Sequence, residues 1–161
     1  MIRMPLFTAQ RLAAAALVTC AMACTPAPAA AQRVRQVIDG DTITVSGVGV
    51  VRLIGVDAPE KAGSYRQSEP YSDAATTFMR ALVDGVVVRL EYDGPRKDQY
   101  NRTLAYVFLP DGRLANEEII RAGWAETYRR FDYGRKPAFF AAEREAKGGR
   151  RGMWAKRLAR P

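Results

Sequence analysis

Runs of β-branched residues separated by short turns dominate the chain between residues 34 and 60. Asp39-Gly40 and Ser46-Gly47-Val48-Gly49 separate the first three runs. Short connections of this kind join neighbouring antiparallel strands, so the pattern predicts a β-meander. Two further strands are expected later in the chain, one on each side of a polar loop. The five expected strands cover residues 34–38, 42–45, 50–56, 86–92 and 102–109.

Apolar residues recur at helical spacing in three other stretches. The first helix is expected to start near Ser68-Glu69-Pro70, with a capping hydroxyl and a proline in its first turn, and to stop at Asp84-Gly85. The second is expected to end near Gly123, and the third to cover residues 137–147. Five strands, with one helix inserted between the third and fourth, predict a single α+β domain: a five-stranded OB-type β-barrel with three α-helices.

The first 31 residues have the pattern of an export signal. Arg3 and Arg11 give a basic start, residues 12–23 are apolar, and a Pro/Ala-rich stretch ends at Ala29-Ala30-Ala31. The apolar run is short for a bilayer span, which takes about 20 residues. We therefore expect residues 1–31 to be a cleaved signal peptide, leaving a domain of residues 32–161 that is periplasmic or secreted.

Both cysteines, Cys20 and Cys24, precede Gln32. A domain that begins at Gln32 contains no cysteine, so a disulfide framework and a structural zinc site are both excluded. Ala21-Met22-Ala23-Cys24 faintly resembles a lipoprotein processing site, which leaves acylation of Cys24 as a minor alternative. Membrane attachment is expected only in that case.

Positive charge dominates the chain, whose formal net charge is +8. Two of its cations and none of its acids precede Gln32, so the domain keeps a net charge of +6. A positive field of this kind favours polyanionic partners such as nucleic acids, heparin-like polymers or anionic membranes.

The chain contains no histidine. Histidine general bases, histidine-bound metals and Ser-His-Asp hydrolysis are therefore excluded. Asp, Glu, Lys, Tyr and a bound metal remain as chemical groups. A metal held without histidine or cysteine must be held by oxygen atoms, which suits Ca²⁺ or Mg²⁺.

Two acidic clusters follow expected strands, at Asp39-Gly40-Asp41-Thr42 and at Asp57-Ala58-Pro59-Glu60. If the first three strands pair in order, both clusters can meet at one end of the barrel. Arg52 lies in the apolar strand between them, where a charge needs a partner or a ligand. Each feature alone is typical of turns and surface ion pairs, and Asp39 in particular fits a turn role.

These residues carry a resemblance to the thermonuclease (staphylococcal nuclease-like) family. The chain is similar to that family in three blocks that occur in order, with further matches at 115–118, 123–125 and 152–154. The similarity runs from about Val34 to Trp154. The three blocks are Ile38-Asp39-Gly40-Asp41-Thr42, Arg52-Leu53-Ile54-Gly55-Val56-Asp57-Ala58-Pro59-Glu60 and Asp98-Gln99-Tyr100-Asn101-Arg102-Thr103-Leu104-Ala105-Tyr106.

The resemblance implies a Ca²⁺ cofactor and a general base. Asp41 and Asp57 would bind the calcium ion with their carboxylates, and the backbone carbonyl of Ala58 would be a third ligand. Glu60 would orient and deprotonate the attacking water molecule.

The resemblance also implies phosphate and substrate contacts. Arg52 and Arg102 would clamp the phosphate, because an arginine fork matches phosphate oxygens. Tyr100 would contact the substrate, and Tyr128 is a candidate for base stacking. Gln99 stands where the best-known member has lysine, and the loop at 61–70 also differs, so those outer contacts do not transfer.

The expected function is that of an exported, calcium-dependent endonuclease acting on DNA and RNA as a monomer and leaving 3′-phosphate products. Two alternatives remain: a catalytically silent OB-type module that binds nucleic acid or protein, and a basic envelope protein that binds anionic polymers. The pairs Arg129-Arg130 and Arg150-Arg151 are expected to be solvated or loosely attracted to phosphate. Trp124, Phe139, Phe140 and Trp154 are expected in the core.

Overall fold

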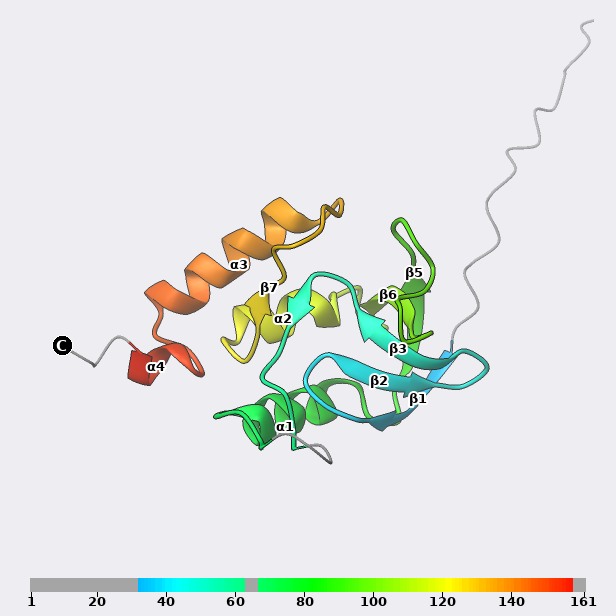
Figure 1. Ribbon diagram of the computed structural model, residues 1–161, viewed down its shortest axis with the longest axis horizontal. Helices are drawn as coiled ribbons and strands as arrows, with labels where there is room; N and C mark the ends of the chain where they lie inside the picture. The colour runs from blue at the N-terminus through cyan, green and yellow to red at the C-terminus, as the bar shows by residue number, and fades with distance from the viewer. Residues whose placement is uncertain (1–31, 63–66, 158–161) are drawn as a thin grey trace, which may run out of the picture.

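Five strands close into a barrel in the computed structural model, which describes residues 32–62 and 67–157 (Figure 1). The order around the barrel is β1-β2-β3-β6-β5, and pairing of β1 with β5 closes it. All pairs are antiparallel except β3 with β6. The strands are β1 (Gln32–Val37), β2 (Thr42–Val45), β3 (Gly49–Leu53), β5 (Val87–Glu91) and β6 (Thr103–Phe108).

Side chains buried on the barrel strands are mostly aliphatic. Because successive strand residues face opposite sides, each strand supplies alternate residues to the interior. The buried aliphatic residues of these strands are Val34, Val37, Ile43, Val45, Val51, Leu53, Val88, Leu90, Ala105 and Val107. This arrangement confirms the five-stranded α+β barrel predicted from the sequence.

The expected strand at 50–56 is divided in two. β3 ends at Leu53, and β4 (Val56–Asp57) pairs instead with β7 (Glu126–Thr127) in a separate two-stranded sheet. Gly55 lies between them with φ of 76°, and a Cβ atom there would come within 2.7 Å of the Tyr133 and Phe139 rings. The backbone therefore turns where only glycine fits, and this turn aims Asp57 away from the barrel sheet.

Four helices complete the described part of the chain: α1 (Ser72–Val83), α2 (Ala115–Arg121), α3 (Lys136–Gly148) and the four-residue α4 (Trp154–Arg157). α2 packs on both α3 and β6, and in Figure 1 it lies between α3 and the strands. No helix among residues 32–62 and 67–157 is long and apolar enough to cross a bilayer.

The expected start of the first helix is wrong by a few residues. Tyr71 is the N-cap, in a left-handed conformation, and no side chain caps the helix. The Ser68 hydroxyl instead lies 3.1 Å from the Ser72 hydroxyl and accepts a hydrogen bond from the backbone N–H of Ala62. Ser68 thus ties the preceding loop together and does not cap α1.

A buried asparagine attaches α2 to the barrel. Asn116 Oδ1 accepts a hydrogen bond from the Val107 N–H at 2.9 Å, and Nδ2 donates to the carbonyls of Ile54 and Ala105. At the other end of the domain, Met153 and Trp154 are buried against Ala146 of α3, as expected of that apolar tail. Phe139 is fully buried, whereas Trp124 and Phe140 are only half-buried.

Candidate active site

A turn between β1 and β2 places Asp41. The Asp39 carboxylate accepts a hydrogen bond from the Asp41 N–H at 3.0 Å, which confirms the turn role expected of Asp39. Gly40 allows a close approach here, since a Cβ atom at this residue would lie 2.6 Å from the Ala58 Cβ. The two acidic segments, separate in the sequence, therefore meet.

Asp41 is buried, with 3% of its surface exposed. Its Oδ2 accepts a hydrogen bond from the Ala58 N–H at 2.9 Å and lies 3.0 Å from Arg52 Nη2, and its Oδ1 accepts one from the Thr42 hydroxyl. Burial raises the pKa of Asp41 to about 7, although the Arg52 charge opposes the rise. A positive charge beyond that of Arg52 would favour the ionised form.

Asp57 lies opposite Glu126 in the β4–β7 pair. Its residue surface is exposed, but desolvation of its carboxyl by the surrounding protein raises its pKa, a rise that Arg52 opposes and the nearby Glu126 and Glu69 charges reinforce. Two carboxyls with raised pKa values thus flank Arg52. A bound cation would favour the ionised form of both carboxyls more strongly than water does.

Glu60 is held at the mouth of the loop that follows β4. The Glu60 N–H donates to Glu69 Oε2 at 3.1 Å, and the Glu69 N–H donates to the Glu60 carbonyl at 2.9 Å. These two bonds close the loop at its base. The Glu60 residue is exposed, so its carboxylate is accessible to solvent.

Asp98 organises the segment that carries Tyr100 and Arg102. Its Oδ1 accepts hydrogen bonds from both backbone N–H groups at 2.9 Å, and its Oδ2 accepts one from Arg102 Nε at 2.7 Å. Burial alone would raise the pKa of Asp98, but the bonds and charge of Arg102 outweigh it and lower the pKa. The Tyr100 ring, 70% exposed, lies 5.3 Å from the Arg102 guanidinium carbon.

One pocket of about 1010 Å³ gathers these residues. All the site residues expected from the sequence line it except Asp41. Asp41 contacts two of the lining residues, Arg52 and Ala58. A second pocket of about 680 Å³ adjoins it and shares five lining residues. The shared residues are Arg52, Tyr100, Arg102, Tyr128 and Arg130.

Sequence reasoning missed several lining residues. Glu69 and Glu126 line the first pocket, and Phe131 lines the second with its ring 5.7 Å from the Tyr128 ring. Exposed acids and aromatics give no local signal of their own.

The atoms of Asp41, Asp57 and Ala58 that could bind a metal ion are carboxylate and carbonyl oxygens. Within residues 32–62 and 67–157, no group of three or more acidic side chains is close enough to hold a metal ion by itself. Two carboxylates with raised pKa values and the adjacent backbone of Ala58 fit a hard divalent cation, provided that the backbone and water complete its coordination. Soft metals that need sulfur or imidazole do not fit.

The fold and the site define a class: an OB-type barrel with carboxylates and arginines around one pocket. A family model described as "Staphylococcal nuclease homologue" matches residues 50–156. The chain belongs to the staphylococcal nuclease family, and its nuclease relatives indicate that it hydrolyses phosphodiester bonds.

Three curated relatives illustrate the similarity. Thermonuclease of Staphylococcus intermedius is 47% identical over 96 residues, which cover 55% of this chain and 57% of that protein. Thermonuclease of Staphylococcus hyicus is 36% identical over 127 residues, covering 76% and 75%. An uncharacterized endonuclease of Escherichia coli is 37% identical over 126 residues, covering 76% of each chain.

Proposed function

We propose that this protein is a calcium-dependent endonuclease that hydrolyses phosphodiester bonds in DNA and RNA and leaves 3′-phosphate products. One observation supports it above the others: Arg52, Glu60 and Arg102 line the same pocket as Asp57. The pocket therefore combines cations that attract a phosphate with acids that can bind a metal or take a proton.

Calcium would be held by the carboxylates of Asp41 and Asp57 and by the backbone carbonyl of Ala58. When bound, such an ion supplies positive charge to the phosphate and makes a water molecule more acidic. Asp41 is already fixed by the Ala58 N–H and by Arg52. These contacts fix the position of the carboxylate beside Ala58, where the proposed ion would be held.

Arg52 and Arg102 would neutralise the charge that accumulates on the phosphate oxygens. Asp41 and the Leu53 carbonyl orient the Arg52 guanidinium, and Asp98 binds only Nε of Arg102. Both side chains still line the pocket. Each can thus present N–H groups to a phosphate without first finding its orientation.

Glu60 would act as the general base. As the water oxygen bonds to phosphorus, Glu60 takes the proton from that water, and the bond between phosphorus and the 5′ oxygen breaks. The 5′ oxygen leaves with the bonding electron pair and acquires a proton from solvent. The phosphate then remains on the 3′ oxygen, which is the proposed product.

Tyr100 and Tyr128 would contact the substrate, since both line the two adjoining pockets. Aromatic faces stack on any base, so these contacts suit DNA and RNA alike.

The test is release of acid-soluble nucleotides from single-stranded DNA and RNA with Ca²⁺, with Mg²⁺ and with chelator. Calcium-dependent release with 3′-phosphate ends supports the proposal. A folded protein that binds DNA but releases nothing with either metal would instead be a nucleic-acid-binding module.

We also propose export, with residues 1–31 as the cleaved signal; they lie outside the described residues. Mass spectrometry of the exported protein tests this, because a start at Gln32 and an acylated Cys24 differ in mass. We further propose a monomer, which sedimentation would check.

A further inference from the structure

Two adjacent arginines that follow β7, Arg129 and Arg130, have different environments. Arg129 is bound to the protein: its Nη1 donates to the Thr127 carbonyl and its Nη2 to Glu143, both at 2.9 Å. Its guanidinium also lies 5.2 Å from the Phe140 ring. Arg129 therefore holds the β7 segment against α3 and is not available to a ligand.

Arg130 has no such partner. Within residues 32–62 and 67–157, its side chain makes no hydrogen bond, ion pair or ring contact, and the residue is exposed. It nevertheless lines both the first and the second pocket. Of the three arginines lining the first pocket, Arg52 forms a salt bridge with Asp41 and Arg102 with Asp98. Arg130 forms no salt bridge within the described residues, although its charge is near enough to Asp57 to oppose the rise in the pKa of that carboxyl.

The position of Arg130 extends beyond the pocket that Asp57 and Glu60 line, although its charge still acts on Asp57. Asp57 and Glu60 line the first pocket only, whereas Arg130 and Tyr128 belong to both pockets. A polynucleotide that places one phosphate beside Glu60 and continues into the second pocket must carry its next phosphate past the shared wall. A guanidinium that forms no hydrogen bond or salt bridge with the described protein at that wall matches such a phosphate in charge and geometry.

We propose that Arg130 binds a phosphate neighbouring the one that is cleaved, so that the preferred substrate contains at least two consecutive phosphates. This inference rests on the proposed nuclease function. Arg130 contributes to binding the ground state and the transition state equally, because its phosphate does not change during the reaction. Its loss therefore raises KM and leaves kcat nearly unchanged.

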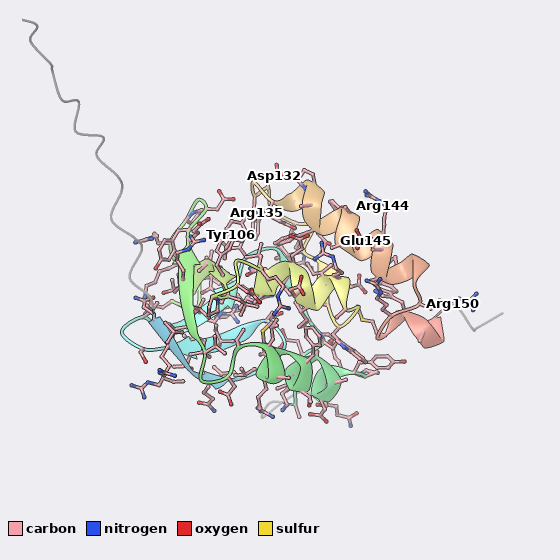
Figure 2. All side chains as sticks on the ribbon, turned by 180° about the vertical axis from the view of Figure 1, so that it is seen from behind. Tyr106, Asp132, Arg135, Arg144, Glu145 and Arg150 are labelled. Carbon is pink, nitrogen blue, oxygen red and sulfur yellow. The ribbon has the colours of Figure 1, made fainter. Side chains whose placement is uncertain are left out.

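Arg144 provides the matched control. It is exposed on α3, where Figure 2 shows it pointing away from the helix, and it lines neither pocket. R130Q and R144Q each remove one exposed positive charge, so they lower the net charge of the protein by the same amount. Any difference between them reports a specific contact.

The first experiment measures binding of a fluorescein-labelled oligothymidylate by anisotropy, in chelator, over roughly 50 to 200 mM salt. R130Q is expected to raise Kd about tenfold, as for loss of one charged hydrogen bond. It should also reduce the slope of log K against log salt by about 0.7, the value for one phosphate on a single strand. R144Q should change Kd by less than about twofold.

The second experiment compares kcat and KM on the oligothymidylate and on a thymidine dinucleotide with a single phosphodiester. R130Q is expected to raise KM about tenfold on the oligonucleotide only. Equal effects of R130Q and R144Q, or equal losses on both substrates, would overturn the inference. A protein that shows the binding difference but cleaves nothing would keep the Arg130 site and refute the proposed function. No binding by the wild-type protein would refute both.

Discussion

At the scale of single residues, Glu60 and Arg52 differ in how firmly the protein holds them. Glu60 is exposed and fixed through its backbone to Glu69, whereas Arg52 is held through its guanidinium by Asp41 and Leu53. A side chain that must accept a proton benefits from access to water. A side chain that must meet phosphate oxygens benefits from fixed orientation.

Substitution Glu60→Gln tests the general base. The amide keeps the size of the side chain but cannot take a proton, so kcat should fall by about 10²–10⁴-fold. Substrate Kd, measured in chelator, should not rise, because Glu60 repels rather than binds the phosphate. Stopped-assay kinetics would check this, and normal turnover in the variant would remove Glu60 from the role.

Substitution Arg52→Lys keeps the charge and removes the fork. A lysine ammonium cannot hold Asp41 and a phosphate in the geometry that the planar guanidinium allows. We expect kcat/KM to fall by at least about 10²-fold, as for loss of one transition-state donor. Circular dichroism should show an intact fold. Near-normal kcat/KM would mean that Arg52 serves structure alone.

The sequence already identified Asp41, Arg52 and Asp57 as a group, but it could not give their contacts. The hydrogen bond from the Ala58 N–H to Asp41 forms because two segments 17 residues apart approach each other. Gly40 permits this approach, since a side chain there would collide with Ala58. Glu143 gave no signal at all. Its burial depends on α3, which is positioned by contacts distant in sequence.

At the scale of elements, local patterns predicted the five barrel strands and the three longer helices. They failed where tertiary contacts determine the backbone conformation. Gly55 ends β3 because two aromatic rings occupy the space a side chain would need. The two-residue strands β4 and β7 exist only because they pair with each other across 69 residues of chain, from Val56 and Asp57 to Glu126 and Thr127.

Glu143 links α3 to the β7 segment that carries the pocket-lining residues Tyr128 and Arg130. It is 2% exposed; its carboxylate accepts bonds from the Thr127 N–H at 3.2 Å and from Lys147 Nζ at 2.6 Å, and pairs with Arg129. Burial alone would raise the pKa of Glu143, but the bonds from Lys147 and Thr127 outweigh burial and lower the pKa below its ordinary value of 4.5.

Substitution Glu143→Gln should therefore destabilise the protein in a pH-dependent way. A carboxyl whose pKa is lower in the folded state stabilises fully above its unfolded pKa, and the contribution is lost as the pH falls through the folded value. We expect a loss of about 2 kcal/mol at neutral pH, as for a broken buried charged bond, and a smaller loss below pH 4.5. Urea unfolding at neutral and acidic pH would check it; a gap that stays constant with pH would contradict it.

At the scale of the whole molecule, a basic domain with a net charge of +6 from Gln32 on brings carboxyls together at one pocket. The surrounding positive field attracts polyanions, while the carboxyls in the pocket offset part of the attraction of its arginines for a phosphate. The net charge can be read from the sequence, and the sequence also predicted that the two acidic clusters meet. The raised pKa values of Asp41 and Asp57 depend on the folded surroundings, so they became visible only in the structure.

Calcium should consequently stabilise the whole domain. An ion that binds the folded chain and not the unfolded one adds about 2.7 kcal/mol at a hundredfold excess over its Kd, which corresponds to a rise in Tm of roughly 10 °C for a domain of this size. Differential scanning calorimetry with Ca²⁺, Mg²⁺ and chelator would measure the shift and identify the preferred ion. Asp57→Asn removes one carboxylate ligand and should abolish most of the shift, whereas R144Q should leave it intact. A Tm that is the same with Ca²⁺ and with chelator would contradict a calcium site at Asp41 and Asp57, whatever the nuclease activity proves to be.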